Sequence, residues 1–448
     1  MLVMAKQQKA VVNRQAKHQK KLLIAVGVIT AIKLMLIPNI QQSLVGFHPG
    51  AWLGSDGETY VAASEALTQD GIFSKNSSLI YYAPGYSLFL SILQILTGKL
   101  LFPFVSLIQT LLYSYSIFFL GQQMLKTKLK KIAFPFVILS LLNPTLSLSS
   151  LVIGYENLIA SFSVLALGLL IRDLKSEKAT FAYSPFLIAA ILLGFTVWLS
   201  PRMILPGFTL LLIWVFCKNG FKKNLFASLM VIAIFLSFQS SIVLRNQIAT
   251  GNLVSQSSLG NLAIMGAGPN ATGSYTDNGT GIICATEGLN ESQSSNKKLS
   301  CAIQWYAKNP GQGLLLLWKK SYYLWSPWFG PLYGGTMARN PYLIFHPVKS
   351  NITTQSQLDL VMGIPGKIIS WVWILGSWLL LVIGFRALFK SGGLQRVIGN
   401  VTLMLIISNW LTVLVVQGDN RYRIPFMPFS LLLQVCGYMT LRKIKYLN

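Results

Sequence analysis

The apolar stretch Gly85-Tyr-Ser-Leu-Phe-Leu-Ser-Ile-Leu-Gln-Ile-Leu-Thr97 decides the fold, because it sets the direction in which every later segment runs. A helix that crosses a bilayer needs about 20 mostly apolar residues, with a lower limit near 17. This stretch is shorter than that limit. Ser87, Ser91 and Gln94 recur at helical spacing on one face, with Leu and Phe on the other. The pattern predicts an amphipathic helix that lies in the membrane interface.

The composition of the whole chain is that of an integral membrane protein. Of the 448 residues, 53% are hydrophobic and only 11% are charged, whereas soluble domains carry about 25% charged residues. Lys and Arg number 37 against 12 Asp and Glu, which gives a formal charge of +25. These values exclude an ordinary cytosolic enzyme, a disordered chain and a nucleic-acid-binding domain.

Ten further apolar runs are predicted to cross the membrane as helices. They cover residues 22–38, 101–123, 132–151, 157–171, 183–199, 203–217, 224–243, 364–386, 397–416 and 425–441. The expected fold class is therefore an all-α polytopic membrane protein. The first run follows a basic tail without a clear cleavage site, so we expect an uncleaved first helix.

The basic clusters orient these helices. They span Lys6 to Lys21, Lys126 to Lys131, Arg172 to Lys178, Lys218 to Lys223, Arg386 to Arg396 and Arg442 to Lys445. Positive residues that flank spans belong on the cytoplasmic side. If the stretch 85–97 lies in the interface, all six clusters fall on that side; if it crosses, every cluster from Lys126 onward falls outside. We therefore predict that both termini are cytoplasmic.

This topology divides the chain into four parts. They are a cytoplasmic basic tail (1–21), an N-terminal transmembrane module (22–243) whose first outer loop covers 39–100, a large outer loop (244–363), and the C-terminal transmembrane helices (364–448). Cys284 and Cys301 share the large outer loop, where a disulfide and two free thiols are about equally expected.

Acids in the outer loops are candidates for chemistry. Asp56 and Glu58 lie in Gly54-Ser-Asp-Gly-Glu-Thr-Tyr60, just outside the first helix. An acid beside apolar surface can act as a general base, although a solvated loop acid or a helix cap is the more common use. Glu156 begins the fourth span; it could act on a substrate or bind a metal, or simply be favoured by the helix dipole.

Four arginines on the outer side depart from the positive-inside trend: Arg202, Arg245, Arg421 and Arg423. The planar guanidinium pairs well with phosphate, and the alternative is contact with lipid headgroups.

The aromatic segment from Trp305 to Tyr333 indicates an interfacial belt, or else a wall for a sugar or prenyl chain. His48 and His346 lack metal-ligand spacing. We therefore predict that no metal cofactor is required, although a divalent metal held with Asp56 or Glu156 stays open.

Three motifs resemble the GT-C membrane glycosyltransferases, in particular glycosyltransferase family 39, the protein mannosyltransferase and lipid A aminoarabinose transferase family. The first is Asp56-Gly-Glu-Thr-Tyr60 followed by Ala83-Pro-Gly-Tyr-Ser-Leu-Phe89. The second is Leu244-Arg-Asn-Gln-Ile-Ala-Thr-Gly-Asn252, followed by Asn261-Leu and Gly268-Pro-Asn-Ala-Thr-Gly273. The third is Asp419-Asn-Arg-Tyr-Arg-Ile-Pro425 with Pro428. They occur in the expected order from residue 54 to 428. Gly57 separates two acids that are adjacent in family members with an acidic pair, so the choice between Asp56 and Glu58 stays open.

The resemblance implies a GT-C-like bundle with outer interfacial helices, and an inverting transfer of a hexose or pentose from a polyprenyl-phosphate carrier to an acceptor hydroxyl. It implies that Asp56 is the base, with Glu58 and Glu156 as further catalytic candidates. Arg245 and Arg421 lie in family-like stretches, and we expect one or more of the four outer arginines to hold the donor phosphate. The matching motif positions are expected to line the substrate cavity: Tyr60, Tyr82, Tyr86, Asn246, Asn270 and Tyr422. The acceptor would be a glycolipid, a glycan or a protein.

Two other functions remain open from the sequence. A transporter or flippase of lipid-linked glycans should carry ionisable residues near span centres and paired repeats, whereas here the charges lie at span ends. A non-catalytic assembly subunit could share the fold. The expected location is the plasma membrane, and we favour a bacterial inner membrane.

Overall fold

The computed structural model describes residues 2–40, 47–48, 50–53, 56–174, 185–218, 221–274, 281–325 and 364–442. His346 and the second half of the aromatic segment therefore lie outside the described residues.

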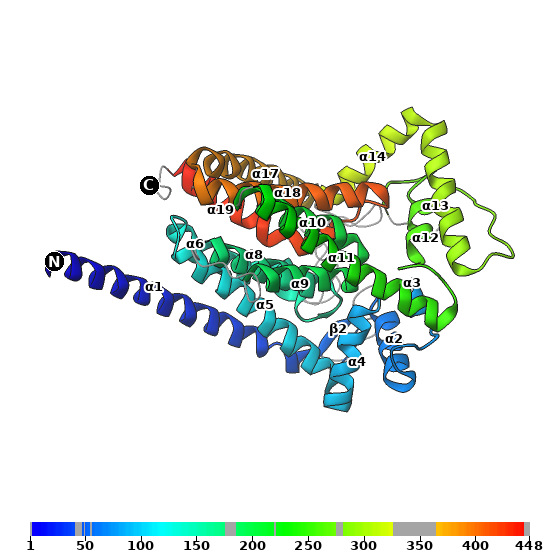
Figure 1. Ribbon diagram of the computed structural model, residues 1–448, viewed down its shortest axis with the longest axis horizontal. Coiled ribbons are helices and arrows are strands. Elements are labelled where there is room, and N and C mark those ends of the chain that lie inside the picture. The colour runs from blue at the N-terminus through cyan, green and yellow to red at the C-terminus, as the bar shows by residue number, and fades with distance from the viewer. Residues whose placement is uncertain are drawn as a thin grey trace.

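Long helices form a bundle, and every predicted apolar run overlaps one of them (Figure 1). They are α1 (Leu2–Leu34), α5 (Leu101–Leu125), α6 (Lys130–Leu142), α8 (Glu156–Leu174), α9 (Pro185–Leu199), α10 (Ile204–Lys218), α11 (Phe221–Thr250), α17 (Ile364–Ser391), α18 (Gly393–Val415) and α19 (Met427–Leu441). Among the described residues, 6 helical segments are long and apolar enough to cross a membrane, and two shorter apolar ones accompany them. The chain is thus a multi-pass membrane protein, and the number of crossings stays a prediction.

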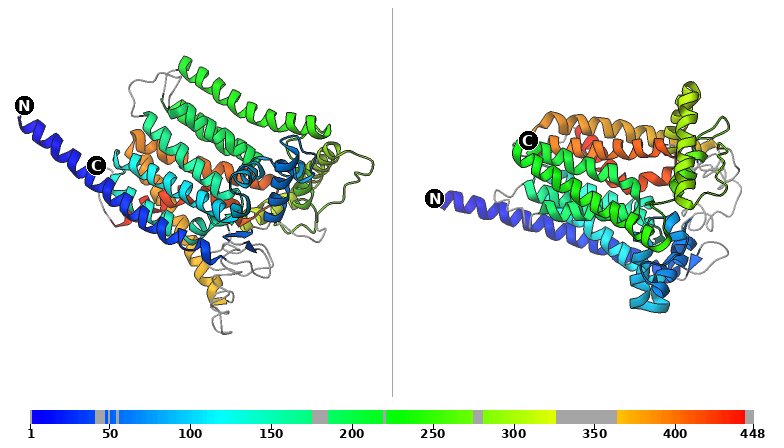
Figure 2. Two further views of the ribbon diagram at one scale, coloured as in Figure 1. Left: turned by 90° about the horizontal axis from the view of Figure 1, so that it is seen from below. Right: turned by 45° about the vertical axis from the view of Figure 1, so that its right-hand side comes forward.

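The second group of helices, most of them short, gathers at one end of this bundle, which we call the short-helix end. They are α2 (Gly57–Asp70), α3 (Ser78–Tyr81), α4 (Gly85–Thr97), α12 (Ser258–Met265), α13 (Glu291–Lys308) and α14 (Pro310–Trp325). Helix α1 begins, and α19 ends, at the opposite end in all three views (Figures 1 and 2). This arrangement is what an even number of crossings requires. Within the short-helix end, Cys284 and Cys301 form a disulfide.

Helix α4 is the stretch that decides the topology. Gly98, at a φ of 53°, starts a 3-10 turn (Gly98–Leu100) that separates α4 from α5. The serine face of α4 packs inward, and the hydroxyls of Ser91 and Thr68 of α2 lie 2.9 Å apart. Ile95 and Leu96 on the opposite face are exposed. The helix therefore turns its apolar face outward, as expected of a helix that contacts lipid.

The predicted run 132–151 is not one helix. Helix α6 ends at Leu142, and Asn143 caps the short helix α7 (Pro144–Ser149) by accepting a hydrogen bond from the backbone N–H of Leu146 at 3.1 Å. Proline disfavours helical backbone at the residue before it, so the Asn143-Pro144 step interrupts the run. The chain after α7 becomes a short strand, β3 (Val152–Ile153).

Strand β3 belongs to a three-stranded sheet in the order β1-β2-β3. Strand β1 (Phe47–His48) pairs antiparallel with β2 (Ala51–Leu53), and β2 pairs parallel with β3. In this register Trp52 lies opposite Val152 and Leu53 opposite Ile153. The sheet ties the first outer loop to the entrance of α8.

Candidate active site

The parallel strand pair brings two acids to the same level. Leu53 pairs with Ile153, and Asp56 and Glu156 each follow three residues later. Each stands at the start of a helix, Asp56 before α2 and Glu156 as the first residue of α8. The side chain of Asp56 is 24% exposed and that of Glu156 is 8% exposed. One carboxylate is therefore accessible from outside and the other is enclosed.

Buried hydrogen bonds hold the segment that carries Glu156. The amide of Gln109 donates to the carbonyl oxygens of Ser150 at 3.1 Å and Val152 at 2.9 Å. The hydroxyl of Tyr86 accepts from the backbone N–H of Gly154 at 2.8 Å. A Cβ atom at Gly154 would lie 2.9 Å from Oε2 of Glu156, so a larger residue there would displace this carboxylate.

Arg421 bridges the two acids. Its Nη1 lies 3.0 Å from Oδ2 of Asp56, and its Nε lies 3.3 Å from Oε1 of Glu156. Arg421 belongs to a 3-10 helix, η6 (Asn420–Phe426), and Asp419 caps this helix by accepting from the backbone N–H of Arg421 at 2.8 Å. Burial raises the pKa of the Asp419 carboxyl, and Arg421 partly opposes that rise. The outer turn before α19 thus reaches both acids across the molecule.

Asp56 does not serve its own helix. It is the N-cap residue of α2 but makes no side-chain capping bond. Its Oδ2 faces Arg421, and its Oδ1 accepts from the hydroxyl of Tyr82 at 3.1 Å. The helix-cap alternative for Asp56 is therefore not supported, and the carboxylate keeps lone pairs for a further donor, because each oxygen has about two.

Tyrosines surround Asp56. The ring of Tyr60 packs against Tyr82, Tyr86 and Tyr155, with ring centroids 5.1, 5.2 and 5.9 Å away. Burial raises the pKa of Tyr60 above its usual value, and burial raises the pKa of Tyr155 to about 12. These hydroxyls stay protonated at neutral pH, so they can donate hydrogen bonds but carry no charge.

Arg202 is the second arginine beside the acids. It lies on a 3-10 turn, η4 (Pro201–Met203), with its guanidinium carbon 4.0 Å from the centre of the Tyr422 ring and 5.6 Å from that of Tyr155. Its three guanidinium nitrogens are buried, and none has a hydrogen-bond partner among the described residues. Buried polar groups are normally paired. Arg202 is therefore a cation available to an anionic ligand.

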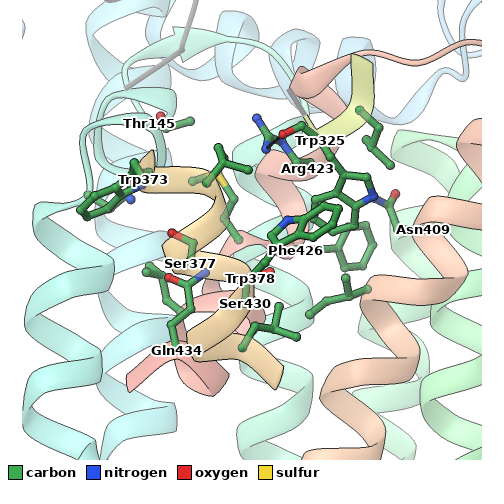
Figure 3. A pocket seen from close by; sticks show the side chains of 17 residues that line it. Thr145, Trp325, Trp373, Ser377, Trp378, Asn409, Arg423, Phe426, Ser430 and Gln434 are labelled. Carbon is green, nitrogen blue, oxygen red and sulfur yellow. Dashed lines mark hydrogen bonds between the residues drawn. The ribbon is translucent and has the colours of Figure 1, made fainter. Parts of the chain in front are cut away.

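A cavity adjoins this cluster (Figure 3). Tryptophans 325, 373 and 378 line it together with polar side chains from α18 and α19. Arg423 lies at the Trp325 end and donates to the carbonyl oxygen of Trp325 at 3.0 Å, while Gln434 marks the opposite end. Asn409, also in the lining, donates to the carbonyl oxygen of Tyr422 at 3.0 Å. The cavity thus borders the residues that carry Arg421.

The structure does not bring Arg245 and Asn246 to the acids. Arg245, on α11, donates to the carbonyl oxygens of Ile72 at 2.9 Å and of Ser74. Asn246 donates to the carbonyl oxygen of Val254 at 2.7 Å. These side chains fasten the end of α11 to the neighbouring loops, which is a structural use of the residues predicted to bind substrate.

Two other predicted residues also stand apart. Glu58, in the first turn of α2, is exposed, and no hydrogen bond or ion pair joins it to the described site. Asn270 is exposed in a turn after α12. The spacing of two residues between Asp56 and Glu58 explains the first case, because side chains two positions apart at a helix start do not face the same side.

Asp419 and Tyr155 are the functional candidates that the sequence analysis missed. Both lie close in sequence to residues that were candidates, Asp419 to Arg421 and Tyr155 to Glu156. No local sequence pattern marks a residue as a helix cap or as a ring that packs against a guanidinium. The described residues contain no group of three or more His, Cys, Asp and Glu that could hold a metal ion.

Comparison with known proteins is informative at the level of structure. Neither a protein-family model nor a curated protein matches the sequence. The apo crystal structure of the Archaeoglobus fulgidus oligosaccharyltransferase is similar to this chain, with a TM-score of 0.50, 12% sequence identity, and coverage of 95% of this chain and 50% of that one. The chain has a GT-C fold.

A second similar structure is the archaeal oligosaccharyltransferase AglB from Archaeoglobus fulgidus in complex with an inhibitory peptide and a dolichol-phosphate. It has a TM-score of 0.49 and 13% identity, and the match covers 96% of this chain and 51% of that one. This chain therefore spans about half the length of the solved GT-C structures that it matches. The GT-C resemblance of the sequence motifs is confirmed as a fold, and membership of family 39 stays a prediction.

Proposed function

We propose that this protein is an inverting glycosyltransferase that moves a sugar from a polyprenyl-phosphate donor to an acceptor hydroxyl at the outer face of the membrane. The observation that carries the proposal is the convergence of a partly exposed carboxylate, Asp56, with Arg421 and the unpaired Arg202 at the short-helix end of the bundle. The GT-C fold supports it. A base and a phosphate-binding cation are what this reaction needs, because a lipid phosphate is already a good leaving group.

Asp56 acts as the general base in this proposal. The acceptor hydroxyl oxygen attacks the anomeric carbon of the donor sugar and passes its proton to the Asp56 carboxylate. The bond between the anomeric carbon and the phosphate oxygen breaks, and its electron pair leaves with the phosphate. General-base assistance of this kind typically contributes about 10²–10⁴-fold to the rate. Tyr82 and Arg421 orient the carboxylate through its two oxygens.

Arg202 holds the departing phosphate. Its unpaired nitrogens can form a bidentate pair with phosphate oxygens, and the rings of Tyr422 and Tyr155 fix the plane of its guanidinium. Charge developing on the phosphate would be stabilised by a cation that is already in position. Because its nitrogens are shielded in this state, entry of the donor requires a local movement of the residues that cover them.

The tryptophan-lined cavity suits the prenyl chain of the donor. It is bounded by α17, α18 and α19, so an apolar chain could enter from the bilayer. Arg423, at the Trp325 end of the cavity, lies one residue beyond Tyr422, which contacts Arg202. A carrier lipid in this cavity would place its phosphate end toward the arginines and the acids.

The test compares cells that express wild type, Asp56→Asn or Glu58→Gln, with equal amounts of each protein in the membrane. Glu58 is the matched control because it is an acid on the same helix turn that does not contact the site. Mass spectrometry of extracted glycolipids and surface glycans should show one species that gains a single sugar with wild type and Glu58→Gln. We expect Asp56→Asn to lower its formation by about 10²-fold or more.

Two results would count against the proposal. If Asp56→Asn forms the species as well as wild type does, Asp56 is not the base. If none of the three folded proteins changes any glycan, a transporter or an assembly subunit becomes the better explanation. The mass increment of the species identifies the sugar as a hexose or a pentose.

A further inference from the structure

The negative charges of the two acids repel each other, and a side chain of the protein itself supplies the positive charge that offsets this repulsion. Asp56 and Glu156 come from different loops, and the strand register brings them to one level. Two carboxylates near each other, one of them almost buried, repel and lose hydration. A cation between them is the usual remedy, and proteins use either a basic side chain or a divalent metal ion for it.

We propose that the Arg421 guanidinium takes the place of a divalent cation between Asp56 and Glu156, so that this site binds and requires no metal. The binding consequence stands on geometry alone, and only the catalytic consequence rests on the proposed function. Arg421 contacts Asp56 through Nη1 at 3.0 Å and Glu156 through Nε at 3.3 Å. One side chain therefore contacts both of the oxygens that would otherwise be the protein ligands.

The surroundings fix this arginine in position. Its backbone N–H donates to the cap Asp419 at 2.8 Å. The carbonyl of the next residue, Tyr422, accepts from Asn409 of α18 at 3.0 Å. The side chain of Arg421 is only 13% exposed. The backbone that carries Arg421 is thus held on both sides, and its guanidinium is largely shielded from solvent.

The chemistry of the remaining side chains also disfavours a metal. Mg²⁺ and Mn²⁺ prefer carboxylate, carbonyl and water oxygens in a near-octahedral arrangement. Asp419, the third acid nearby, uses its carboxylate oxygen on the backbone N–H of Arg421. Arg202 adds a second positive charge that acts on both Glu156 and Asp419. A doubly charged ion would have to enter beside two guanidinium groups, which repel it.

The test measures Mn²⁺ binding to the purified full-length protein in detergent by electron paramagnetic resonance. Wild type and Arg421→Lys, which keeps the charge, should leave millimolar Mn²⁺ free in solution. Arg421→Gln removes the charge and should expose a two-carboxylate site whose affinity for Mn²⁺ is higher by about tenfold or more. The double variant Arg421→Gln with Asp56→Asn should lose the gained binding. Arg202→Gln is the matched control, because Arg421 remains between the acids.

Two outcomes would overturn the inference. The first is stoichiometric Mn²⁺ binding by wild type that Asp56→Asn or Glu156→Gln abolishes. The second is a folded, monodisperse Arg421→Gln protein with no more affinity for Mn²⁺ than wild type. If Arg421→Gln does not fold, the wild-type measurement with its two acid variants still decides, because absence of binding there is the predicted result.

An activity measurement separates this inference from the proposed function. Sugar transfer by wild type should be unchanged after removal of divalent ions with a chelator, and restored metal should not increase it. A protein that transfers sugar only with added metal would contradict the role of Arg421 while it confirms the transferase. A protein that transfers no sugar but behaves as predicted toward Mn²⁺ would confirm the role of Arg421 and contradict the proposed transferase function.

Discussion

Two turns at the short-helix end of the bundle each carry a buried arginine, and the surroundings of the two guanidinium groups differ. The turn η6 places Arg421 between two carboxylates. The turn η4 places Arg202 against aromatic rings, where none of its nitrogens has a hydrogen-bond partner among the described residues. The ring of Tyr422 lies near both, at 4.0 Å from Arg202 and 5.6 Å from Arg421. Arg421 therefore joins two acids, whereas Arg202 is the cation that we propose for the donor phosphate.

The largest effect should follow from removing the paired cation. Arg421→Met keeps most of the side-chain volume but leaves Asp56 and Glu156 facing each other without a counter-charge. Removing one partner of a buried ion pair costs about 3–5 kcal/mol, and we expect the lower end because Asp56 is partly exposed. Thermal unfolding in detergent measures this loss.

The control for that experiment is the triple variant in which Asp56→Asn and Glu156→Gln accompany Arg421→Met. It removes the charges together, and neutral replacement of a whole buried pair is often harmless. Its melting temperature should recover toward the wild-type value. If the single variant is as stable as wild type, the ion pairs do not organise the site.

Removing Arg202, the unpaired cation, should affect the transfer reaction more than the stability of the protein. Arg202→Met takes away a buried charge that makes no hydrogen bond among the described residues and loses only a longer-range attraction to Glu156 and Asp419. The melting temperature should therefore fall much less than in Arg421→Met. Formation of the glycan species should fall by about 10²–10³-fold, the usual cost of losing one group that stabilises developing negative charge. A loss of stability as large as that of Arg421→Met would show that Arg202 is structural and that the two turns do not differ.

The sequence predicted the helices well because their signal is local. Each apolar run gave a helix, and 85–97 forms the separate helix α4 at the end of the bundle, while its position in the membrane interface stays a prediction. The exception is 132–151, where Asn143-Pro144 is itself a local breaker signal that the apolar run concealed. Hydropathy measures how well a segment suits the bilayer, and it does not register where the backbone must stop being helical.

The site was predicted only in part because its contacts are not local. Asp56, Glu156 and Arg421 were each candidates, but nothing in the sequence says that residues 365 positions apart form an ion pair. The same reasoning placed Arg245 with them, whereas that arginine holds backbone carbonyls of the loop after α2. Which arginine meets an acid depends on strand register and helix packing, and these follow from the whole fold.

Lys320 of α14 tests whether a buried cation at this end needs an acid as its partner. It is intermediate between the two arginines because it has a hydrogen-bond acceptor, which Arg202 lacks among the described residues, but no acid, which Arg421 has. It is buried, and its ammonium donates to the carbonyl oxygen of Leu414 at 3.0 Å and lies 5.3 Å from the centre of the Tyr306 ring. Burial lowers the pKa of Lys320 to about 7, whereas the unfolded chain has a value of about 10.4. The folded state therefore binds fewer protons than the unfolded state between these values, and Lys320 should make the protein more stable as the pH rises from about 7 to 10.

Lys320→Met removes this dependence. The difference in melting temperature between wild type and Lys320→Met should move in favour of wild type as the pH rises from 7 to 9, with a slope of up to about 1.4 kcal/mol per pH unit. Other titrating groups cancel in the difference, because both proteins contain them. A difference that does not change with pH would mean that the Lys320 ammonium stays charged in the folded protein, held by one carbonyl and one ring. A buried cation would then need no acid at this end of the bundle, and the lack of a partner at Arg202 would lose its value as a sign of ligand binding.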